Sequence, residues 1–308
     1  MRVVSSPVHP HDRPARFDVG IVGAGRVGAV LGAALQRAGH RVTGVSAVSE
    51  ASRERAATLL PGVPVKPIPA VVEGAHLVVL AVPDDALADL IAGLAVTRSF
   101  TPGQIVMHTS GAHGLAVFAP AADSQVIPLA LHPAMTFTGT ALDLERLADC
   151  CFGTTTMYLA RPLGEALVIE MGGEPVWIAE EERVAYHLAL SHGANHLVTL
   201  VAQSMQLLAA AGVEEPSRVL EPLLSAALAN TLRMGDAALT GPVARGDAGT
   251  VAGHVARLRE LAPDIRPTYL ALARATAQRA LLSGRLRAAA AEPLLRLLAS
   301  DDPDEESP

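Results

Sequence analysis

A glycine-rich segment near the beginning of the sequence has the spacing of a phosphate-binding loop. Residues 23–28 fit the pattern G-x-G-x-x-G. In this pattern the first glycine permits a tight turn, the second lets the backbone approach a pyrophosphate, and the third lets a helix pack closely on a strand. The pyrophosphate would lie at the N-terminus of the following helix, where free N–H groups favour an anion. We therefore expect a dinucleotide to contact Gly23, Ala24, Gly25, Arg26, Val27 and Gly28.

The residues after the second expected strand bear on the choice between NAD and NADP. NAD sites usually place Asp or Glu about 20 residues beyond the glycine motif to bind the ribose 2′-hydroxyl. This sequence has Val45-Ser46-Ala47 instead. Without the carboxylate a 2′-phosphate is not repelled, and serine hydroxyls such as that of Ser46, with Arg53 or Arg55, could hold it. Glu50 argues the other way, and either arginine could instead lie on a helix surface. We expect NADP, with NAD as the weaker alternative.

Polar clusters follow three apolar runs, at the strand ends where ligands of parallel sheets bind. They come directly after Val82, at His108 and at His132. The tight Ser110-Gly111 turn could direct backbone N–H groups at a nicotinamide or a substrate, so we expect Val82, Ser110 and Gly111 to contact the cofactor. His132 could donate a hydrogen bond to a substrate, or it could be a strand-end histidine held by local backbone.

A later, mostly apolar segment carries polar side chains in one row. His187, Ser191 and Asn195 are spaced i, i+4 and i+8, which places them on one helix face. Because burying such groups without partners is costly, the row is either a polar cleft wall that contacts substrate or a set of interhelical hydrogen bonds. A second histidine pair on this segment lacks the glutamate of zinc-binding H-E-x-x-H helices, so we expect no metal.

A second polar segment interrupts the later helices between Thr240 and His254. Its Gly-Pro and Gly-Asp pairs shape a loop, from which Arg245 could grip a substrate carboxylate with two parallel hydrogen bonds. We expect Asp247 to contact the same substrate, and His254 lies one helical turn after Thr250. The alternative is a turn in which Arg245 and Asp247 pair to cap the next helix.

The segments that must position these residues alternate between strand and helix in the first half. Apolar runs predict strands over 17–22, 40–47, 75–82, 104–111, 125–133, 154–160 and 175–179. From Glu180 the pattern predicts helices over 180–212, 216–239, 249–262, 266–283 and 288–299, with three glutamates in the first turn of the first helix. The alternation indicates an α/β, doubly wound sheet followed by an all-α domain. We expect a dinucleotide-binding domain over 17–179, a helical substrate and dimerisation domain over 180–300, and disordered tails over 1–16 and 301–308.

The composition narrows the classes of protein. The formal charge of the 308 residues is −7, and five of the negative charges lie in residues 301–306, so we expect neither a nucleic-acid partner nor a membrane partner. No run of about 20 apolar residues could span a bilayer. Cys150 and Cys151 are adjacent and cannot form a disulfide framework, so we expect two buried thiols and a cytoplasmic protein. Lys66 is the only lysine.

Several segments carry a resemblance that covers nearly the whole length expected to be ordered. They are GAGRVGAVLG, AVPDD, HTSG, LHPAMTF, YHLALSHGANHLVTL and LTGPVARGDAGTVAGH. They resemble the bacterial family in which a Rossmann-like domain is fused to a C-terminal helical domain of unknown function. The wider superfamily to which it is similar includes pyrroline-5-carboxylate reductase, prephenate dehydrogenase, ketopantoate reductase and the 6-phosphogluconate dehydrogenases.

The resemblance implies NAD(P)-dependent hydride transfer in a cleft between the domains, often with the helical domain forming a dimer. Matching positions imply that this cleft is lined by His187, Asn195, Arg245, Asp247 and His254. One departure is the lysine count, because the 6-phosphogluconate and hydroxyacid dehydrogenases and ketopantoate reductase use a catalytic lysine of the helical domain. No lysine follows Lys66 here, which disfavours that chemistry.

We expect from these patterns an NADP-dependent oxidoreductase that acts on a small carboxylate-bearing carbonyl, imine or alcohol as a homodimer. Arg245 would bind the carboxylate and Asn195 a polar substituent, with Ser191 also contacting substrate. His187 or His254 would move the proton, because imidazole titrates near neutral pH. Two alternatives are a ketopantoate-reductase-like enzyme without the usual lysine and a non-catalytic NAD(P)-binding sensor or scaffold.

Overall fold

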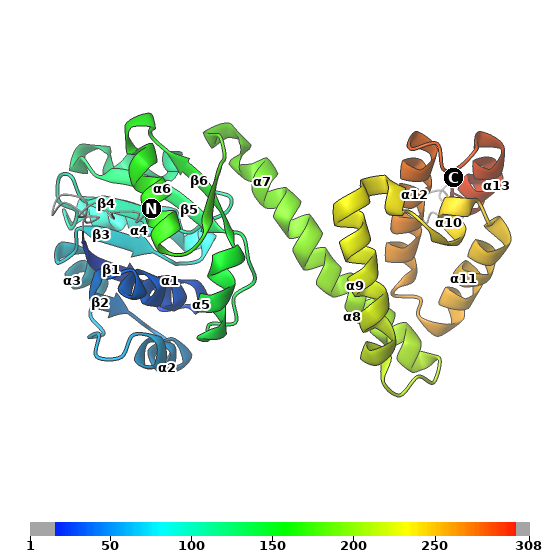
Figure 1. The fold of residues 1–308 in the computed structure, drawn as a ribbon, viewed down its shortest axis with the longest axis horizontal. Coiled ribbons are helices and arrows are strands. Elements are labelled where there is room, and N and C mark those ends of the chain that lie inside the picture. The colour runs from blue at the N-terminus through cyan, green and yellow to red at the C-terminus, as the bar shows by residue number, and fades with distance from the viewer. Residues whose placement is uncertain (1–15, 300–308) are drawn as a thin grey trace, which may run out of the picture. The chain divides into compact units, whose positions relative to one another are not determined.

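A seven-stranded sheet is the centre of the first of two compact units. The computed structural model describes residues 16–299, and the boundary between the units falls between Gly193 and Ala194. The strand order is β2-β1-β3-β4-β5-β6-β7 (Figure 1). The strands are β1 (Asp18–Val22), β2 (Arg41–Ser46), β3 (Leu77–Leu80), β4 (Ile105–His108), β5 (Ile127–Pro133), β6 (Cys151–Thr156) and β7 (Glu174–Trp177). The predicted α/β, Rossmann-like fold class is confirmed. Apart from Arg16, the predicted tails lie outside the described residues.

The last two strands run against the rest of the sheet. β1 to β5 are parallel, but β6 pairs antiparallel with β5, from Leu129 opposite Thr156 to Pro133 opposite Phe152. β7 then pairs parallel with β6. The strand predicted over 154–160 was placed too late in the sequence, because residues 158–160 form a 3₁₀ turn, η4 (Tyr158–Ala160).

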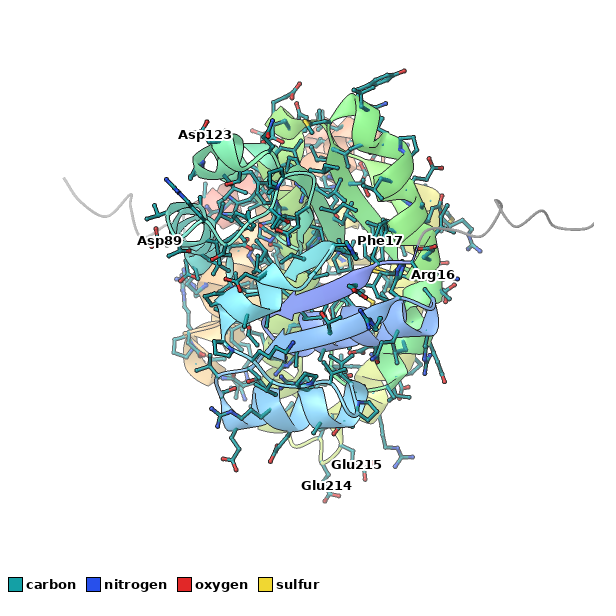
Figure 2. All side chains as sticks on the ribbon, turned by 90° about the vertical axis from the view of Figure 1, so that its left-hand side faces the viewer. Arg16, Phe17, Asp89, Asp123, Glu214 and Glu215 are labelled. Carbon is teal, nitrogen blue, oxygen red and sulfur yellow. The ribbon has the colours of Figure 1, made fainter. Side chains whose placement is uncertain are left out.

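Helices cover both faces of the sheet, each over its own apolar cluster. One face packs against α1 (Arg26–Arg37), α2 (Glu50–Leu59) and α6 (Arg161–Glu170). The other face packs against α3 (Ile68–Glu73), α4 (Asp84–Val96) and the 3₁₀ helix η2 (Leu115–Ser124), and Asp89 and Asp123 point outward there (Figure 2). The short helices α5 (Leu142–Arg146) and η3 (Leu147–Asp149) precede β6. Successive residues of β3 alternate between the clusters, so an entirely apolar strand is buried on both faces.

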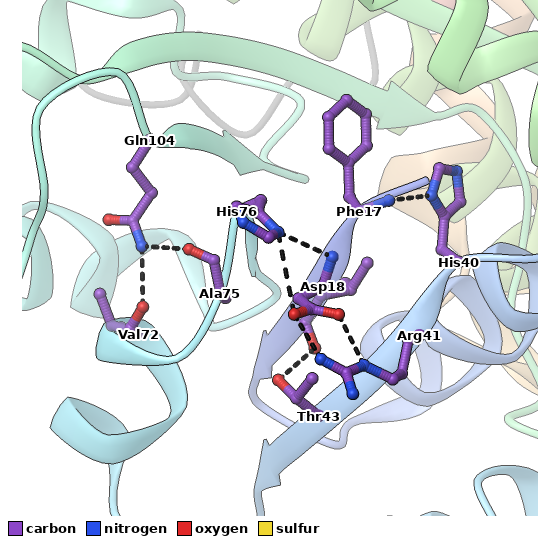
Figure 3. A network of polar contacts seen from close by, with 10 residues as sticks. Phe17, Asp18, His40, Arg41, Thr43, Val72, Ala75, His76 and Gln104 are labelled. Carbon is purple, nitrogen blue, oxygen red and sulfur yellow. Dashed lines mark hydrogen bonds and ion pairs between the residues drawn. The ribbon is translucent and has the colours of Figure 1, made fainter. Parts of the chain in front are cut away.

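A polar network ties the amino ends of the first strands together (Figure 3). Arg41 Nε donates to the Asp18 carboxylate at 2.6 Å, and Phe17 N donates to His40 Nδ1 at 3.0 Å. The hydrogen bond from Arg41 lowers the pKa of Asp18. Gln104 donates to two backbone carbonyls nearby. These contacts occupy the amino edge of the sheet, so they leave the carboxyl edge for a ligand.

The helix predicted over 180–212 is interrupted twice. A 3₁₀ turn, η5 (Glu180–Glu182), precedes α7 (Arg183–Leu190), and a π-helical turn, η6 (Ser191–Asn195), separates α7 from α8 (His196–Ala210). The glutamate pattern was expected to favour the start of this helix, but the Glu180 carboxylate instead accepts hydrogen bonds from the first N–H groups of η2. A π turn has a longer hydrogen-bond spacing than an α turn. The α-helical spacing that placed His187, Ser191 and Asn195 in one row therefore does not apply across η6.

The regular elements of the second unit are all helices within its described residues. After α8 come α9 (Pro216–Met234), the 3₁₀ turn η7 (Gly235–Ala238), α10 (Gly241–Arg245), α11 (Ala248–Leu261), α12 (Arg266–Leu282) and α13 (Ala288–Ala299). Its core is formed by α10 to α13 and includes Val251, Ala277 and Leu294. In contrast, no residue of α8 is buried, and Leu220 is the one buried residue of α9.

The cysteines differ from each other in environment. Cys150 is buried, as expected, but Cys151 is exposed, which corrects the expectation of two buried thiols. Burial raises the pKa of Cys150 to about 11.

Within residues 16–299, no helix has both the length and the apolar character needed to cross a bilayer.

Candidate functional site

The glycine-rich loop has the geometry that each glycine predicts. Gly23 adopts φ +96°, a region that favours glycine. A Cβ on Gly28 would overlap the Gly23 carbonyl, so glycine is needed for α1 to approach β1. At Gly25 nothing lies within 4 Å of the Cβ position, which leaves open space at the N-terminus of α1. The residues present therefore fit the pyrophosphate of a dinucleotide.

Ser46, at the carboxyl end of β2, holds this loop by hydrogen bonds. Its Oγ accepts a hydrogen bond from Gly23 N at 2.9 Å, and its carbonyl accepts one from Ala24 N. Ser46 is 6% exposed, so its hydroxyl is already engaged in holding the turn. A 2′-phosphate would need further donors from nearby.

Two arginines provide such donors beside the loop. Arg55 Nη1 donates to the Ala24 carbonyl at 3.1 Å. A Cβ on Gly139 would lie 2.8 Å from Arg55 Cδ and 3.0 Å from Arg26 Cγ, so both side chains reach the same backbone position. Arg53, the arginine chosen from the sequence, is exposed on α2, and its side chain forms no hydrogen bond or ion pair within the described residues. Arg55 is thus the α2 arginine in contact with the loop.

The turn after β4 is held by a buried histidine. His108 Nδ1 accepts a hydrogen bond from Ser110 N at 3.2 Å, so Nε2 carries the proton and donates to the Gly114 carbonyl at 2.9 Å. Burial lowers the pKa of His108 to about 4, which keeps this tautomer neutral at pH 7. Val82, the neighbouring predicted residue, lies after β3 and is half-buried.

His132, near the carboxyl end of β5, lies among aromatic side chains of α7. Its Nδ1 is 2.9 Å from Tyr186 Oη, and its ring meets the rings of Tyr186 and His187 edge-on at 5.6 and 6.3 Å. A Cβ on Gly111 would lie 2.6 Å from His187 Cδ2 and 3.1 Å from His132 Nε2. Burial, aided by the charge of Arg183, lowers the pKa of His132 to about 4. The structure therefore brings Gly111, His132 and His187 together, and a side chain rather than local backbone holds His132.

Arg183, the first residue of α7, is the largest fully buried side chain that the structure describes. Its guanidinium donates to the carbonyls of His113 at 2.9 Å, Gly153 at 3.0 Å and Ser110 at 2.5 Å. It also lies over the ring of Tyr186, 5.7 Å from the centroid. Arg183 thereby fixes α7 and Tyr186 against the turn that contains Gly111.

The predicted residues from Ser191 to Asp247 have separate environments. Asp247 caps α11, accepting hydrogen bonds from Thr250 N at 3.0 Å and Thr250 Oγ1 at 2.7 Å, and these bonds lower its pKa. The Arg245 side chain is exposed and forms no hydrogen bond or ion pair within residues 16–299, so Asp247 accepts the capping hydrogen bonds without it. Asn195 ends the π turn and is exposed, while Ser191 begins that turn and is half-exposed.

A cavity of about 350 Å³ lies within the second unit, and His254 is part of its wall. His254 Nδ1 is 2.9 Å from Tyr269 Oη, and Gln203 Nε2 donates to Thr268 Oγ1 at 3.2 Å. The remaining wall combines apolar side chains of α8, α10 and α12 with the hydroxyl groups of Ser204, Thr240 and Thr276, and no Asp, Glu, Lys or Arg lines it. The cavity therefore suits an uncharged group that is mostly apolar and carries a hydrogen-bond donor or acceptor.

Sequence reasoning considered Arg55 beside Arg53 but missed Arg183 and Tyr186. Arg183 follows three glutamates and reads as surface charge. The available signal was the spacing of Arg183 and Tyr186, which puts both on one helix face three residues apart. Nothing in the spacing shows that this face meets the turn after β4, which depends on contacts between distant segments.

The fold and the glycine loop define a Rossmann-like protein, and residues 4–133 match the Rossmann-like domain. Residues 150–276 match a second family, a domain of unknown function, DUF2520. The chain therefore joins a Rossmann-like domain to a DUF2520 domain, which confirms the resemblance seen in its motifs. No relative was found among the curated proteins.

Solved structures share this fold at low sequence identity. A Bacteroides fragilis protein proposed to be an NADP oxidoreductase is 21% identical, with a TM-score of 0.73, covering 85% of this chain and 98% of its own. An imine reductase variant from Myxococcus stipitatus in complex with NAD⁺ is 19% identical, with a TM-score of 0.58, covering 86% and 94%. An NADP-bound pyrroline carboxylate reductase from Plasmodium falciparum is 11% identical, with a TM-score of 0.55, covering 86% and 97%.

Proposed function

We propose that this protein is an NADP-dependent oxidoreductase acting on a small carbonyl, imine or alcohol that bears a carboxylate. One observation carries the proposal: the open glycine loop and the His132–Tyr186 pair lie at the same edge of the sheet. Both follow the carboxyl ends of parallel strands, where cofactors of such sheets bind. The oxidoreductases among the structural neighbours support the same class of activity.

The chain's own residues would bind and orient the reactants. Bound NADPH would supply a hydride, which is one proton with two electrons, to the substrate carbon. Residues 23–28 would hold the pyrophosphate, and Val82 with the Ser110-Gly111 turn would face the nicotinamide. Because Gly111 has no side chain, His132 and His187 reach the same turn.

Reduction of a carbonyl or imine also needs a proton on the substrate oxygen or nitrogen. His132 is neutral at pH 7, so it is suited to hydrogen bonding rather than to carrying that proton. Burial raises the pKa of Tyr186, which therefore stays protonated and orients His132. We assign the proton transfer to His187, with His254 as the alternative that the sequence predicts.

Substrate recognition would use the predicted residues Ser191, Asn195, Arg245 and Asp247. Arg245 has a free, exposed guanidinium suited to a carboxylate. It does not line the cavity beside His254. Asn195, Ser191 and Asp247 stay predictions for substrate contact.

The exposed apolar faces of α8 and α9 support a homodimer. Val198 is 70% exposed, Leu223 63% and Leu232 80%. A soluble chain rarely leaves so many large apolar side chains on neighbouring helices in contact with water. We propose that a second copy covers them. The cytoplasmic location predicted from the cysteines also stays a prediction.

Cofactor choice is tested by titrating NADPH and NADH against the purified protein. We expect NADPH to bind at least about tenfold more tightly, ~1.4 kcal/mol. Arg55→Ala should abolish most of this preference, because its guanidinium lies beside the loop. Arg53→Ala tests the residue chosen from sequence, and Arg37→Ala, an exposed arginine at the end of α1, is the control. Equal affinities for the two cofactors would contradict the NADP assignment.

Catalysis is tested by following NADPH absorbance with a panel of keto acids, cyclic imines and hydroxy acids, with ketopantoate included. We expect turnover of at least one carboxylate-bearing compound, and loss of that turnover in His187→Ala with cofactor binding retained. Tight NADPH binding without turnover of any compound would instead favour a non-catalytic NADP-binding protein.

A further inference from the structure

The buried guanidinium of Arg183 carries a charge that no carboxylate neutralises directly. Its side chain is 1% exposed, and its partners are three backbone carbonyls. Within residues 16–299 it forms no ion pair. Burial lowers the pKa of Arg183, but an arginine stays protonated at neutral pH because its ordinary pKa exceeds about 12. A full positive charge is therefore fixed inside the first unit.

This charge contacts the turn that we expect to face the nicotinamide. Ser110 O accepts a hydrogen bond from the guanidinium, and the peptide to Gly111 is trans. A trans peptide directs its C=O and N–H to opposite sides, so the Gly111 N–H points away from Arg183. No backbone group in the described chain accepts a hydrogen bond from this N–H, although Gly111 is buried. The far side of the peptide is therefore suited to a ligand.

The charge is felt by side chains around the turn. Burial is the main cause of the low pKa of His132, and the charge of Arg183 is the next. The acidic groups that act on Arg183 in return are Glu180 and Asp84. The Glu180 carboxylate is held by the first N–H groups of η2, and Asp84 lies in the first turn of α4. Neither reaches the guanidinium, so the field at the turn stays positive.

We propose that Arg183 makes this site bind the reduced nicotinamide cofactor more tightly than the oxidised one. The inference rests on the proposed function, because it requires a dinucleotide whose nicotinamide lies near the Ser110-Gly111 turn. The oxidised ring carries one positive charge that the reduced ring lacks. A fixed cation nearby therefore raises the free energy of the oxidised complex alone. The protein would therefore bind mainly NADPH, the form of the cofactor that reduces a substrate, rather than NADP⁺, the form that oxidises one.

The test compares the dissociation constants of NADPH and NADP⁺ in the full-length chain, without any substrate. For the unmodified protein we expect NADPH to bind at least about tenfold more tightly. In Arg183→Gln this ratio should fall about tenfold, because NADP⁺ binds more tightly while the dissociation constant of NADPH changes little. Arg183→Lys keeps the charge and should keep most of the ratio. Arg41→Gln, at the amino edge of the sheet, is the control and should change nothing.

A second variant tests the same field with the opposite sign. Asp84→Asn removes a negative charge near Arg183, so the preference for NADPH should rise, by about threefold. This variant decides the matter if Arg183→Gln does not fold, as judged by circular dichroism and melting. An unchanged ratio in Asp84→Asn and in a folded Arg183→Gln overturns the proposal. Failure of the unmodified protein to bind either form would refute the proposed function instead, whereas equal binding of both forms refutes only the role of Arg183.

Discussion

At the scale of single residues, the site depends on two histidines that the fold keeps neutral. His108 holds the turn after β4 and His132 pairs with Tyr186, and burial lowers the pKa of each histidine to about 4. His108 can only accept the Ser110 N–H while Nδ1 is unprotonated. Protonation would therefore break a bond on which the position of Gly111 depends.

Stability should fall as the pH drops from about 6.5 to about 4. In this window the unfolded chain, with ordinary histidines, binds more protons than the folded chain, so the free energy of unfolding decreases with decreasing pH. The two shifts together correspond to a few kcal/mol, on the order of 1.4 kcal/mol for each pKa unit. Urea unfolding at pH 7 and pH 4.5 measures the loss.

Variants identify the groups responsible for this pH dependence. His132→Gln and His108→Gln should each remove about half of the loss. If neither His132→Gln nor His108→Gln reduced the slope, other groups would control acid stability.

The glycine loop could be predicted from the sequence because each of its three glycines acts on neighbouring backbone. The same is true of the turn at Ser110 and Gly111, which follows directly from an apolar run. Tyr186 and Arg183 could not be predicted in this way. Their roles come from contacts with residues 54 and 73 positions away, namely His132 and Ser110.

At the scale of elements, Glu180 joins two segments that the sequence treats separately. Its carboxylate accepts hydrogen bonds from Leu115 N at 2.6 Å and Ala116 N at 2.8 Å. The contact caps η2 and fixes the chain just before α7. The position of α7, and hence that of Tyr186, therefore depends on the contact between Glu180 and the start of η2.

Glu180→Ala should lower the free energy of unfolding by about 1 kcal/mol, as the loss of a helix cap does. Glu181→Ala is the matched control, because Glu181 is exposed and forms no hydrogen bond or ion pair within the described residues. The control should stay within about 0.5 kcal/mol of the unmodified protein. Chemical denaturation measures both, and equal effects of the two variants would mean that the cap adds nothing to stability.

Most elements were predictable, but the direction of β6 and the π turn were not. Apolar runs of four to eight residues identify a strand and are silent on the direction of its neighbour. Only the pairing of Leu129 with Thr156 shows that the chain has turned back. Likewise, the segment from 183 to 210 has helical composition throughout, and nothing in it marks a turn with altered spacing at Ser191–Asn195.

At the scale of the whole molecule, the two units differ in how much of their apolar surface is buried in a core. The sheet of the first unit is covered on both faces, whereas α8 and α9 bury almost nothing within the second unit. Only 3% of the residues are aromatic, so alanine, valine and leucine supply the apolar surface both of the covered sheet and of the exposed helices. The apolar surface of α8 and α9 is what a partner copy would bury.

Leu223→Glu should convert a dimer into a monomer, because a carboxylate cannot be buried unpaired in an apolar interface. Light scattering coupled to size exclusion measures the mass against 31.8 kDa for one chain. Leu159→Glu is the control, because Leu159 is 91% exposed but belongs to the first unit. A monomeric unmodified protein would refute the dimer, and dissociation by both variants would point to a different interface.

Lys66 offers a practical route to these measurements. The side chain lies along Gly44 of β2, its backbone N donates to Val45 O, and no other lysine occurs in the sequence. β2 ends at Ser46, which holds the glycine loop. An amine-reactive fluorophore would therefore label a single ε-amine close to the dinucleotide loop. Its emission would report cofactor binding directly, without substrate and without introducing a cysteine.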